Sequence, residues 1–213
     1  IFVTIKFLRT MTKNNLLSEQ LNYNGDSQTP THLHLCSYNT AQVEKSRIEN
    51  AEDLERSLKK EHINWVQVHG LQNTTVIRQV CELFGIDFLT TQDILNINHL
   101  TKIEEHDNYN VIIIKLLSRD KDGGYTPQHL GVVQGDSFLI TFTERETDFF
   151  NEILSALNKN VLKIRNRQTD YLLSVILNSA MAGFMSILTT MEDELEDLEE
   201  RFLSPDSYVA PGI

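Results

Sequence analysis

The alternation of apolar and polar positions in the first third of the chain predicts a hairpin followed by a short helix. Residues 33–38 and 41–46 alternate at strand spacing around Asn39-Thr40, which favours a tight turn between two antiparallel strands. Asn50 is then expected to cap a short helix that contains Leu54 and Leu58.

The middle of the chain continues as strands and helices in turn. Residues 65–68 are expected to form a strand, and residues 73–83 carry an apolar stripe at helical spacing. Gly85 would end that helix, because glycine tolerates the positive φ of a helix C-terminus. Thr90 and Thr91 are expected to cap the next short helix, which runs to Leu95.

A charged segment and three apolar segments follow. Residues 102–105 are expected to be a charged turn, and the β-branched residues 111–117 a buried strand. That strand is expected to pair with residues 130–134 and 137–143, and a further helix fits residues 149–162. Interleaved strands and helices predict an α/β (α+β) fold with a mixed sheet and helices on its faces.

The last part of the chain predicts one long helix over residues 170–203, which ends before Pro205. Apolar residues recur along it in steps of three and four, a spacing typical of helix-on-helix packing. These seam residues are Met181, Phe184, Leu188, Met191, Leu195, Leu198 and Phe202. Residues 192–200 are acidic except at the seam, and we expect them to form a solvated outer face.

Composition excludes several classes of protein. A formal net charge of −11 argues against binding to nucleic acid, which requires a basic surface. Cys36 and Cys81 lie far apart and are expected to be buried, unpaired thiols. No uninterrupted run of about 18 apolar residues occurs, so no segment is expected to span a bilayer. No glycine-rich phosphate loop, nucleophile elbow or zinc-protease motif is present, which argues against an enzyme.

Several motifs in the same order resemble the cytoplasmic domain of CorA-type magnesium/cobalt transporters. They are Ile63-Asn64-Trp65-Val66-Gln67-Val68-His69-Gly70-Leu71, Phe84-Gly85-Ile86, Asp93-Ile94-Leu95-Asn96, Lys102-Ile103-Glu104, Asn108-Tyr109 and Asp170-Tyr171-Leu172-Leu173. The resemblance covers roughly residues 32–203. It implies an αβα sandwich in a cytoplasmic, regulatory position, with the stalk and the transmembrane helices in a further C-terminal part.

The resemblance also implies a site and partners. Asp93 would bind a regulatory divalent ion, Mg²⁺ with Co²⁺ as a second ion, together with a ligand from the stalk of a neighbouring subunit. Gln92 and Asn178 are weaker candidates, because they stand where family members often carry acids. The parent protein would be a homopentamer in the cell membrane, and this part of it would lie soluble on the cytoplasmic side.

Two alternatives stay open at this point: a zinc-transporting relative with the same fold, and a soluble acidic interaction module that assembles through its heptad helix. The expected organisation is a poorly ordered arm over 1–31, the αβα domain over 32–166, the acidic helix over 167–204 and a tail over 205–213. His32 and His34 share one strand face, but no third ligand has a spacing suited to a metal site.

Overall fold

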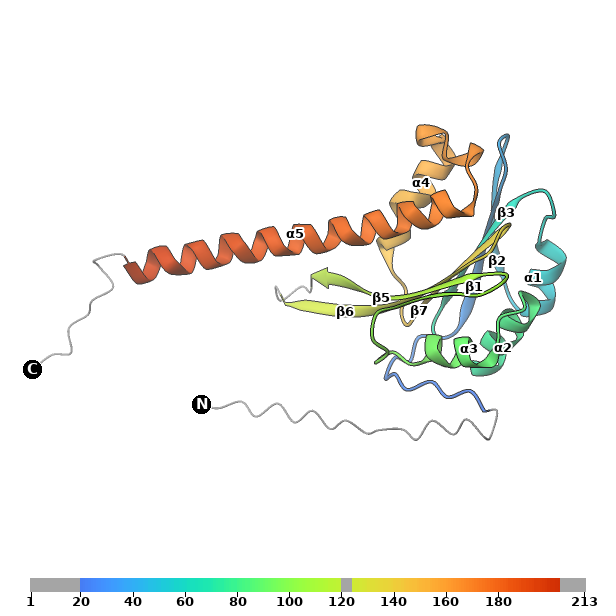
Figure 1. Cartoon of the computed structure of the whole chain (residues 1–213), viewed down its shortest axis with the longest axis horizontal. Coiled ribbons are helices and arrows are strands. Elements are labelled where there is room, and N and C mark those ends of the chain that lie inside the picture. The colour runs from blue at the N-terminus through green and yellow to red at the C-terminus, as the bar shows by residue number, and fades with distance from the viewer. Residues whose placement is uncertain (1–19, 120–123, 204–213) are drawn as a thin grey trace, which may run out of the picture.

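The computed structural model describes residues 20–119 and 124–203. Figure 1 shows a twisted sheet with helices on both sides and one helix that extends far beyond the sheet. The elements in chain order are β1 (His32–Tyr38), β2 (Val43–Ile48), α1 (Ala51–Ser57), β3 (Ile63–His69), α2 (Thr74–Leu83), α3 (Phe88–Leu95), β4 (Lys102–Glu105), β5 (Asn110–Arg119), β6 (Tyr125–Gln134), β7 (Phe138–Thr143), the 3₁₀ turn η1 (Asp148–Phe150), α4 (Asn151–Lys159), the 3₁₀ segment η2 (Val161–Asn166) and α5 (Thr169–Leu203).

The sheet is mixed, and its strand order is β2-β1-β3-β7-β6-β5-β4. β3 and β7 are parallel, whereas the other neighbours are antiparallel. This confirms the predicted mixed sheet and the hairpin of β1 and β2. One predicted pairing is wrong: β7 does not pair with β5. The short β6–β7 connection places β7 on the other side of β6, beside β3.

Each face of the sheet buries its own core. On one face α1, α2 and α3 pack over strand residues that include Leu35, Val66 and Ile113. On the other face α4 and the start of α5 pack over Trp65 and Val132, among others. Side chains alternate along each strand, so consecutive residues supply opposite cores. The predicted αβα architecture is therefore confirmed.

The predicted cap of α1 is confirmed, and the predicted cap of α3 is wrong. The Asn50 side chain caps α1 as predicted, and Asn73, with which the next helix was expected to begin, caps α2. Helix α3 begins earlier than predicted, because Asp87 is its N-cap and accepts a hydrogen bond from the Thr90 amide at 2.8 Å. Thr90 and Thr91 therefore lie inside the helix. An aspartate three residues before an amide satisfies the orphan donors better than the inner threonines can.

Two further predictions about secondary structure are wrong. Residues 102–105 form the edge strand β4 and not a turn, since their backbone groups pair with β5. The helix predicted over 149–162 ends at Lys159, because Asn160 takes a left-handed conformation with φ of 53°. The chain then continues through η2, in which Leu162 and Lys163 also have positive φ.

The segment before β1 differs from the predicted loose arm where it is described. Residues 20–31 have no regular secondary structure, yet Ser27 is buried, and Tyr23 donates a hydrogen bond to Glu144 at 2.5 Å. Side-chain contacts therefore hold an irregular segment in place. The remainder of the predicted arm and the predicted tail lie outside the described residues.

Helix α5 has two different halves. Its first turns bury Leu172, Ile176 and Ala180 against the sheet, whereas all of residues 191–203 are exposed. An 18-residue window of α5 has a mean hydropathy of 1.8 and is 17% buried, so by length and composition α5 could cross a membrane. Interspersed Ser, Asn and Gly lower its mean hydropathy only slightly, which is why a search for uninterrupted apolar runs does not single out this helix. A single helix of this kind is weak evidence for a span.

Candidate functional site

Helix α3, which carries Asp93, is anchored at its N-terminus by Asp87. The Asp87 carboxylate accepts hydrogen bonds from the Tyr109 hydroxyl at 2.6 Å and from the Thr90 hydroxyl at 3.0 Å. Burial acts to raise the pKa of Asp87, but the hydrogen bonds from Tyr109 and Thr90 outweigh it and hold that pKa below its usual range. A charged cap of this kind fixes where the helix starts and therefore where Asp93 points.

The C-terminal end of α3 is held from the sheet. His129 on β6 donates a hydrogen bond from Nε2 to the Ile94 carbonyl at 2.8 Å, and Lys115 on β5 donates to the Ile97 carbonyl. Burial, together with the charge of Lys115, lowers the pKa of His129 to about 4. A neutral imidazole therefore supports the last turn of α3 at neutral pH.

Asp93 itself lies in a row of charged side chains at the edge of the sheet. Its Oδ2 accepts a hydrogen bond from Lys102 Nζ on β4 at 2.7 Å, and His99 Nε2 lies 3.5 Å from its Oδ1. Lys102 Nζ also lies 2.5 Å from the Glu104 carboxylate. The hydrogen bonds to Asp93 and Glu104 raise the pKa of Lys102, and the same ammonium lowers the pKa of Glu104.

The immediate consequence is that the Asp93 carboxylate already has a counter-ion. The side chains of Asp93 and Lys102 are 25% and 27% exposed, so the pair is open to solvent and to an incoming ion. No group of three or more His, Cys, Asp or Glu residues that could hold a metal ion occurs within residues 20–119 and 124–203. A divalent ion at Asp93 would need further ligands from outside this part of the chain and would compete with Lys102.

Exposed apolar side chains lie beside this charged row. Leu89, one turn before Asp93 on α3, is 58% exposed, and Leu100, next to His99, is 83% exposed. Ile103 is 77% exposed, but it stands between Lys102 and Glu104 on β4 and therefore points to the opposite face of the sheet. Exposed apolar residues gathered beside a polar group are typical of surfaces that another molecule covers. The surroundings of Asp93 therefore have the composition of a contact surface.

Gln92 has a structural role in the folded chain. It is buried, its Oε1 accepts a hydrogen bond from the Asn22 amide at 2.9 Å, and its Nε2 donates to the Asn22 carbonyl at 2.8 Å. Both polar atoms of the side chain thus have protein partners. The amide fixes the irregular segment before β1 against α3 and is not directed at Asp93.

Asn178 is not brought to Asp93 within one chain. It lies exposed on α5, which packs on the face of the sheet opposite to α3. Figure 1 shows the two helices on the two sides of the sheet. Any joint role of Asn178 and Asp93 would require two copies of the chain, so both residues stay predictions as ligands.

The structure also assembles a histidine cluster that sequence spacing could not reveal. The ring of His69 on β3 lies 5.2 Å from that of His32 and 5.7 Å from that of His34. His69 Nδ1 is 2.8 Å from the Thr143 hydroxyl, and burial lowers the pKa of His69 to about 4. The antiparallel register of β1 and β3 pairs His32 with His69, a contact between positions 37 residues apart in sequence. The rings of His32 and His69 stack, whereas His34 meets His69 edge-on. Among the described residues these three histidines do not form a group that could hold a metal ion.

Comparison with known proteins identifies relatives of this arrangement. The family model described as "CorA-like Mg2+ transporter protein" matches residues 60–209. A cobalt/magnesium transport protein CorA from Thermotoga maritima is 24% identical over 196 residues, which are 92% of this chain and 56% of that protein.

Solved structures show the same fold. The CorA magnesium transporter from Methanocaldococcus jannaschii aligns with a TM-score of 0.59 and 20% identity, over 80% of this chain and 51% of that one. The ZntB cytoplasmic domain from Vibrio parahaemolyticus aligns with a TM-score of 0.58 and 12% identity, over 78% of this chain and 64% of that domain. The chain thus spans about half the length of the full-length proteins that it matches.

Proposed function

Because the family model matches residues 60–209, the chain belongs to the CorA-like Mg²⁺ transporter family, and we propose that it is the cytoplasmic, ion-sensing part of a divalent-cation transporter. The transported ion of the parent protein is Mg²⁺, with Co²⁺ as a second ion, in line with the names of its relatives. The role is one of transport and its regulation, with no catalytic step.

The observation that carries the sensing role is the surface around Asp93. This carboxylate is partly exposed, lies near exposed Leu89 and Leu100, and has too few neighbouring ligands among the described residues to hold an ion. A second copy that covers the apolar side chains would bring its own oxygen ligands to Asp93. Mg²⁺ accepts such a site, because it takes oxygen ligands and keeps several waters.

Sensing would work through the charge balance at that contact. Two facing carboxylates repel by about 4 kcal/mol at an effective dielectric near 20. A bound Mg²⁺ removes this repulsion, whereas its loss favours separation of the subunits. Lys102 offsets part of the negative charge of Asp93, so the ion has to displace or share its ammonium contact. We therefore expect weaker ion binding than at a site without this lysine.

The proposed assembly is a homopentamer in the cell membrane, with this domain on the cytoplasmic side. The seam residues of α5 support an assembly of some kind, because Met181, Leu188 and Leu195 are 59%, 52% and 64% exposed. An apolar stripe of this length is stable in water only when other helices cover it. Those helices would come from the remaining part of the transporter or from other subunits.

Zinc transport is the second candidate, because the ZntB domain matches this fold as closely as the magnesium transporter does. Ligand chemistry does not separate the two ions, because Asp93 has the Glu104 carboxylate nearby, which suits Mg²⁺, and the His99 imidazole 3.5 Å away, which suits Zn²⁺. The family description and the name of the Thermotoga relative favour magnesium. Flux of Mg²⁺, Co²⁺ and Zn²⁺ into liposomes that contain the full-length protein would decide between the two. Faster flux of Zn²⁺ than of Mg²⁺ would overturn the assignment.

The sensing role is tested with Asp93→Ala in the full-length protein. Mg²⁺ should protect the wild type against limited proteolysis, and the variant should need about tenfold more Mg²⁺ for the same protection. Glu105→Gln is the matched control, because Glu105 is an exposed carboxylate on β4 with no ion pair among the described residues. Equal protection of the wild type and the Asp93 variant would contradict the proposal.

A further inference from the structure

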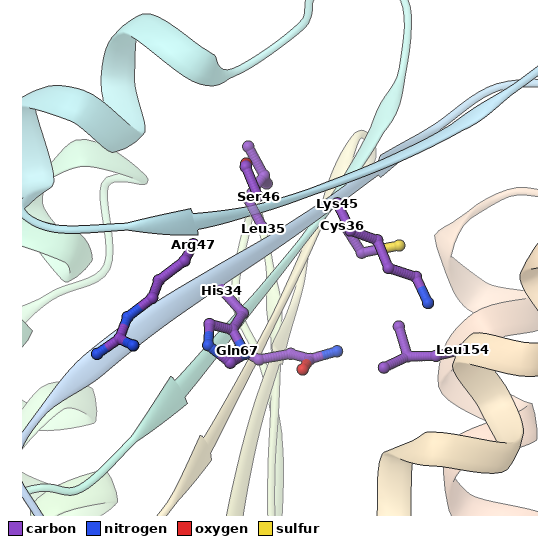
Figure 2. A pocket seen from close by; sticks show the side chains of 8 residues that line it. All are labelled: His34, Leu35, Cys36, Lys45, Ser46, Arg47, Gln67 and Leu154. Carbon is purple, nitrogen blue, oxygen red and sulfur yellow. The ribbon is translucent and has the colours of Figure 1, made fainter.

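A cavity of about 240 Å³ lies between the β1–β2–β3 part of the sheet and helix α4, on the face opposite to Asp93. Paired residues of neighbouring strands form its floor. His34 on β1 pairs with Arg47 on β2 and with Gln67 on β3, and Cys36 pairs with Lys45 on β2. Leu154 of α4 forms the wall, as Figure 2 shows. Helix α4 covers the sheet as far as Leu154 and leaves the polar side chains of β1, β2 and β3 that line the cavity uncovered.

The polar side chains that line the cavity have unused hydrogen-bonding groups. Gln67 is only 4% exposed, yet its carboxamide makes no hydrogen bond to any described residue. The side chains of His34, Lys45 and Arg47 likewise form no hydrogen bond or ion pair within the described part of the chain. Neither amide atom of Gln67 is among the fully enclosed polar atoms that lack a partner in the described residues, so the carboxamide opens into the cavity, where a ligand can bond to it. The buried amide of Gln92, by contrast, is fully bonded.

The charge of the cavity is opposite to that of the whole protein. Lys45 brings a cationic group to the side of the cavity on which Leu154 lies, although the chain carries a net charge of −11; Arg47 extends away from that side. The nearby carboxylate of Glu146 is engaged by His32, whose Nε2 lies 3.3 Å away. Positive charge held without a partner in an acidic protein favours an anionic ligand.

The cavity has two sides with different chemistry. In Figure 2, Lys45 and Gln67 extend to the side of His34 on which Leu154 lies, and Arg47 extends to the other side. An ammonium and a carboxamide therefore stand beside the apolar surface of Leu154 and the Cys36 thiol. This combination suits a ligand that carries an oxyanion group on an apolar body.

We propose that this cavity binds a small organic anion, with its carboxylate or phosphate group bonded to Lys45 and Gln67 and its apolar part against Leu154. The site is separate from Asp93, from which the sheet divides it, and it does not depend on the transport role. The domain would then have a second binding site, for an organic anion, in addition to the proposed ion site at Asp93.

The test is an NMR titration of the ¹⁵N-labelled 213-residue chain with phenyl phosphate, benzoate and inorganic phosphate. At least one of the two organic probes should cause saturable shifts of the Gln67 side-chain amide and of neighbouring β1, β2 and β3 amides below about 10 mM. Lys45→Gln and Gln67→Leu should each weaken this binding by about tenfold. Arg47→Gln, which removes the same charge from the same exposed strand, should weaken it by no more than about twofold.

Three outcomes would overturn the proposal. The first is the lack of any saturable shift with both organic probes. The second is an equal loss for Arg47→Gln and Lys45→Gln, which indicates unspecific attraction to a basic surface. The third is equal affinity for inorganic phosphate, which removes the organic part of the ligand. Lys45 is exposed, so its variant should fold normally, and unchanged amide shifts outside the cavity verify this.

Discussion

At the residue scale, the behaviour expected of Asp93 depends on the side chains that contact it more than on its place in helix α3. Its counter-ion, Lys102, is nine residues away and reaches it because β4 lies at the sheet edge beside the end of α3. The sequence identified the aspartate through the family resemblance. It could not identify the lysine, because Lys102 was assigned to a turn and turns place side chains unpredictably. The ion pair changes the expected behaviour of the site.

The first prediction concerns this lysine. Lys102→Met keeps most of the side-chain volume and removes the competing ammonium, so the full-length protein should bind Mg²⁺ at Asp93 more tightly, by about threefold to tenfold. Protection against proteolysis as a function of Mg²⁺ concentration measures the change. Unaltered or weaker Mg²⁺ dependence would show that Lys102 does not compete with the ion.

The second prediction concerns the N-cap of α3. Asp87→Ala removes the bonds to the Thr90 amide and the Tyr109 hydroxyl and should lower the free energy of unfolding by about 1–3 kcal/mol in urea denaturation. Asp87→Asn retains a good cap and should lose less. Similar losses in the two variants would mean that the charge, and not the cap, is responsible.

The third prediction is a pH dependence carried by His129. Its folded-state pKa of about 4 lies below the ordinary value of 6.5, so the unfolded chain takes up protons first. The stabilisation is complete above about pH 6.5 and is lost as the pH falls toward 4, by roughly 1–3 kcal/mol. Lys115 and His99 face this ring and disfavour its charging.

Urea denaturation between pH 7 and pH 5 measures this effect. His129→Gln can still donate to the Ile94 carbonyl but cannot titrate, so its stability should depend less on pH than that of the wild type. His69, which has a similarly lowered pKa, accounts for part of the remaining slope. An unchanged slope in the His129 variant would assign the whole effect to His69 and the carboxylates.

At the element scale, α5 combines a docked half and a free half in one uninterrupted helix. The spacing of apolar residues predicted the helix and its seam, and the helix is confirmed over 169–203. Spacing could not tell which apolar residues pack on the sheet, because Leu172 and Leu195 have the same local pattern. Only the position of the sheet beneath the first turns separates them.

The fourth prediction follows from this division. Ile176→Ala should destabilise the fold by about 2–4 kcal/mol, because Ile176 is fully buried against the sheet. Leu195→Ala should change the free energy of unfolding by less than about 0.5 kcal/mol, since Leu195 is 64% exposed. Equal losses in urea denaturation would mean that the distal half is covered in solution.

At the scale of the whole molecule, the first turns of α5 belong to the folded domain, because they complete the core on one face of the sheet. The core on the α4 face includes Leu172, Ile176 and Ala180, so the compact unit extends past the boundary at 166 that the sequence suggested. The segment before β1 belongs to it as well, through the contacts of Asn22 and Tyr23. The boundaries of the folded unit are therefore wider than the pattern of strands and helices indicates.

The fifth prediction tests these boundaries. A chain that ends after Gly183 should unfold cooperatively with a midpoint temperature within a few degrees of that of the full chain, because the buried part of α5 is retained. A chain that ends after Arg167 should lose cooperative unfolding, because the strand residues that Leu172, Ile176 and Ala180 cover are then exposed. Circular dichroism on heating measures both. Equal behaviour of the two truncations would contradict this account of the domain.

Local patterns in the chain were enough to predict the order and type of most elements, the family and the candidate aspartate. These predictions rest on the spacing of apolar residues, on the Asn50 cap, and on motifs in a fixed order. Tertiary structure alone decided that β7 lies beside β3, that Lys102 pairs with Asp93, and that His34, Lys45 and Gln67 share a cavity. The physical reason is the same in each case. Strand register and crossover connections bring distant residues together, and no local pattern of apolar and polar positions records that choice.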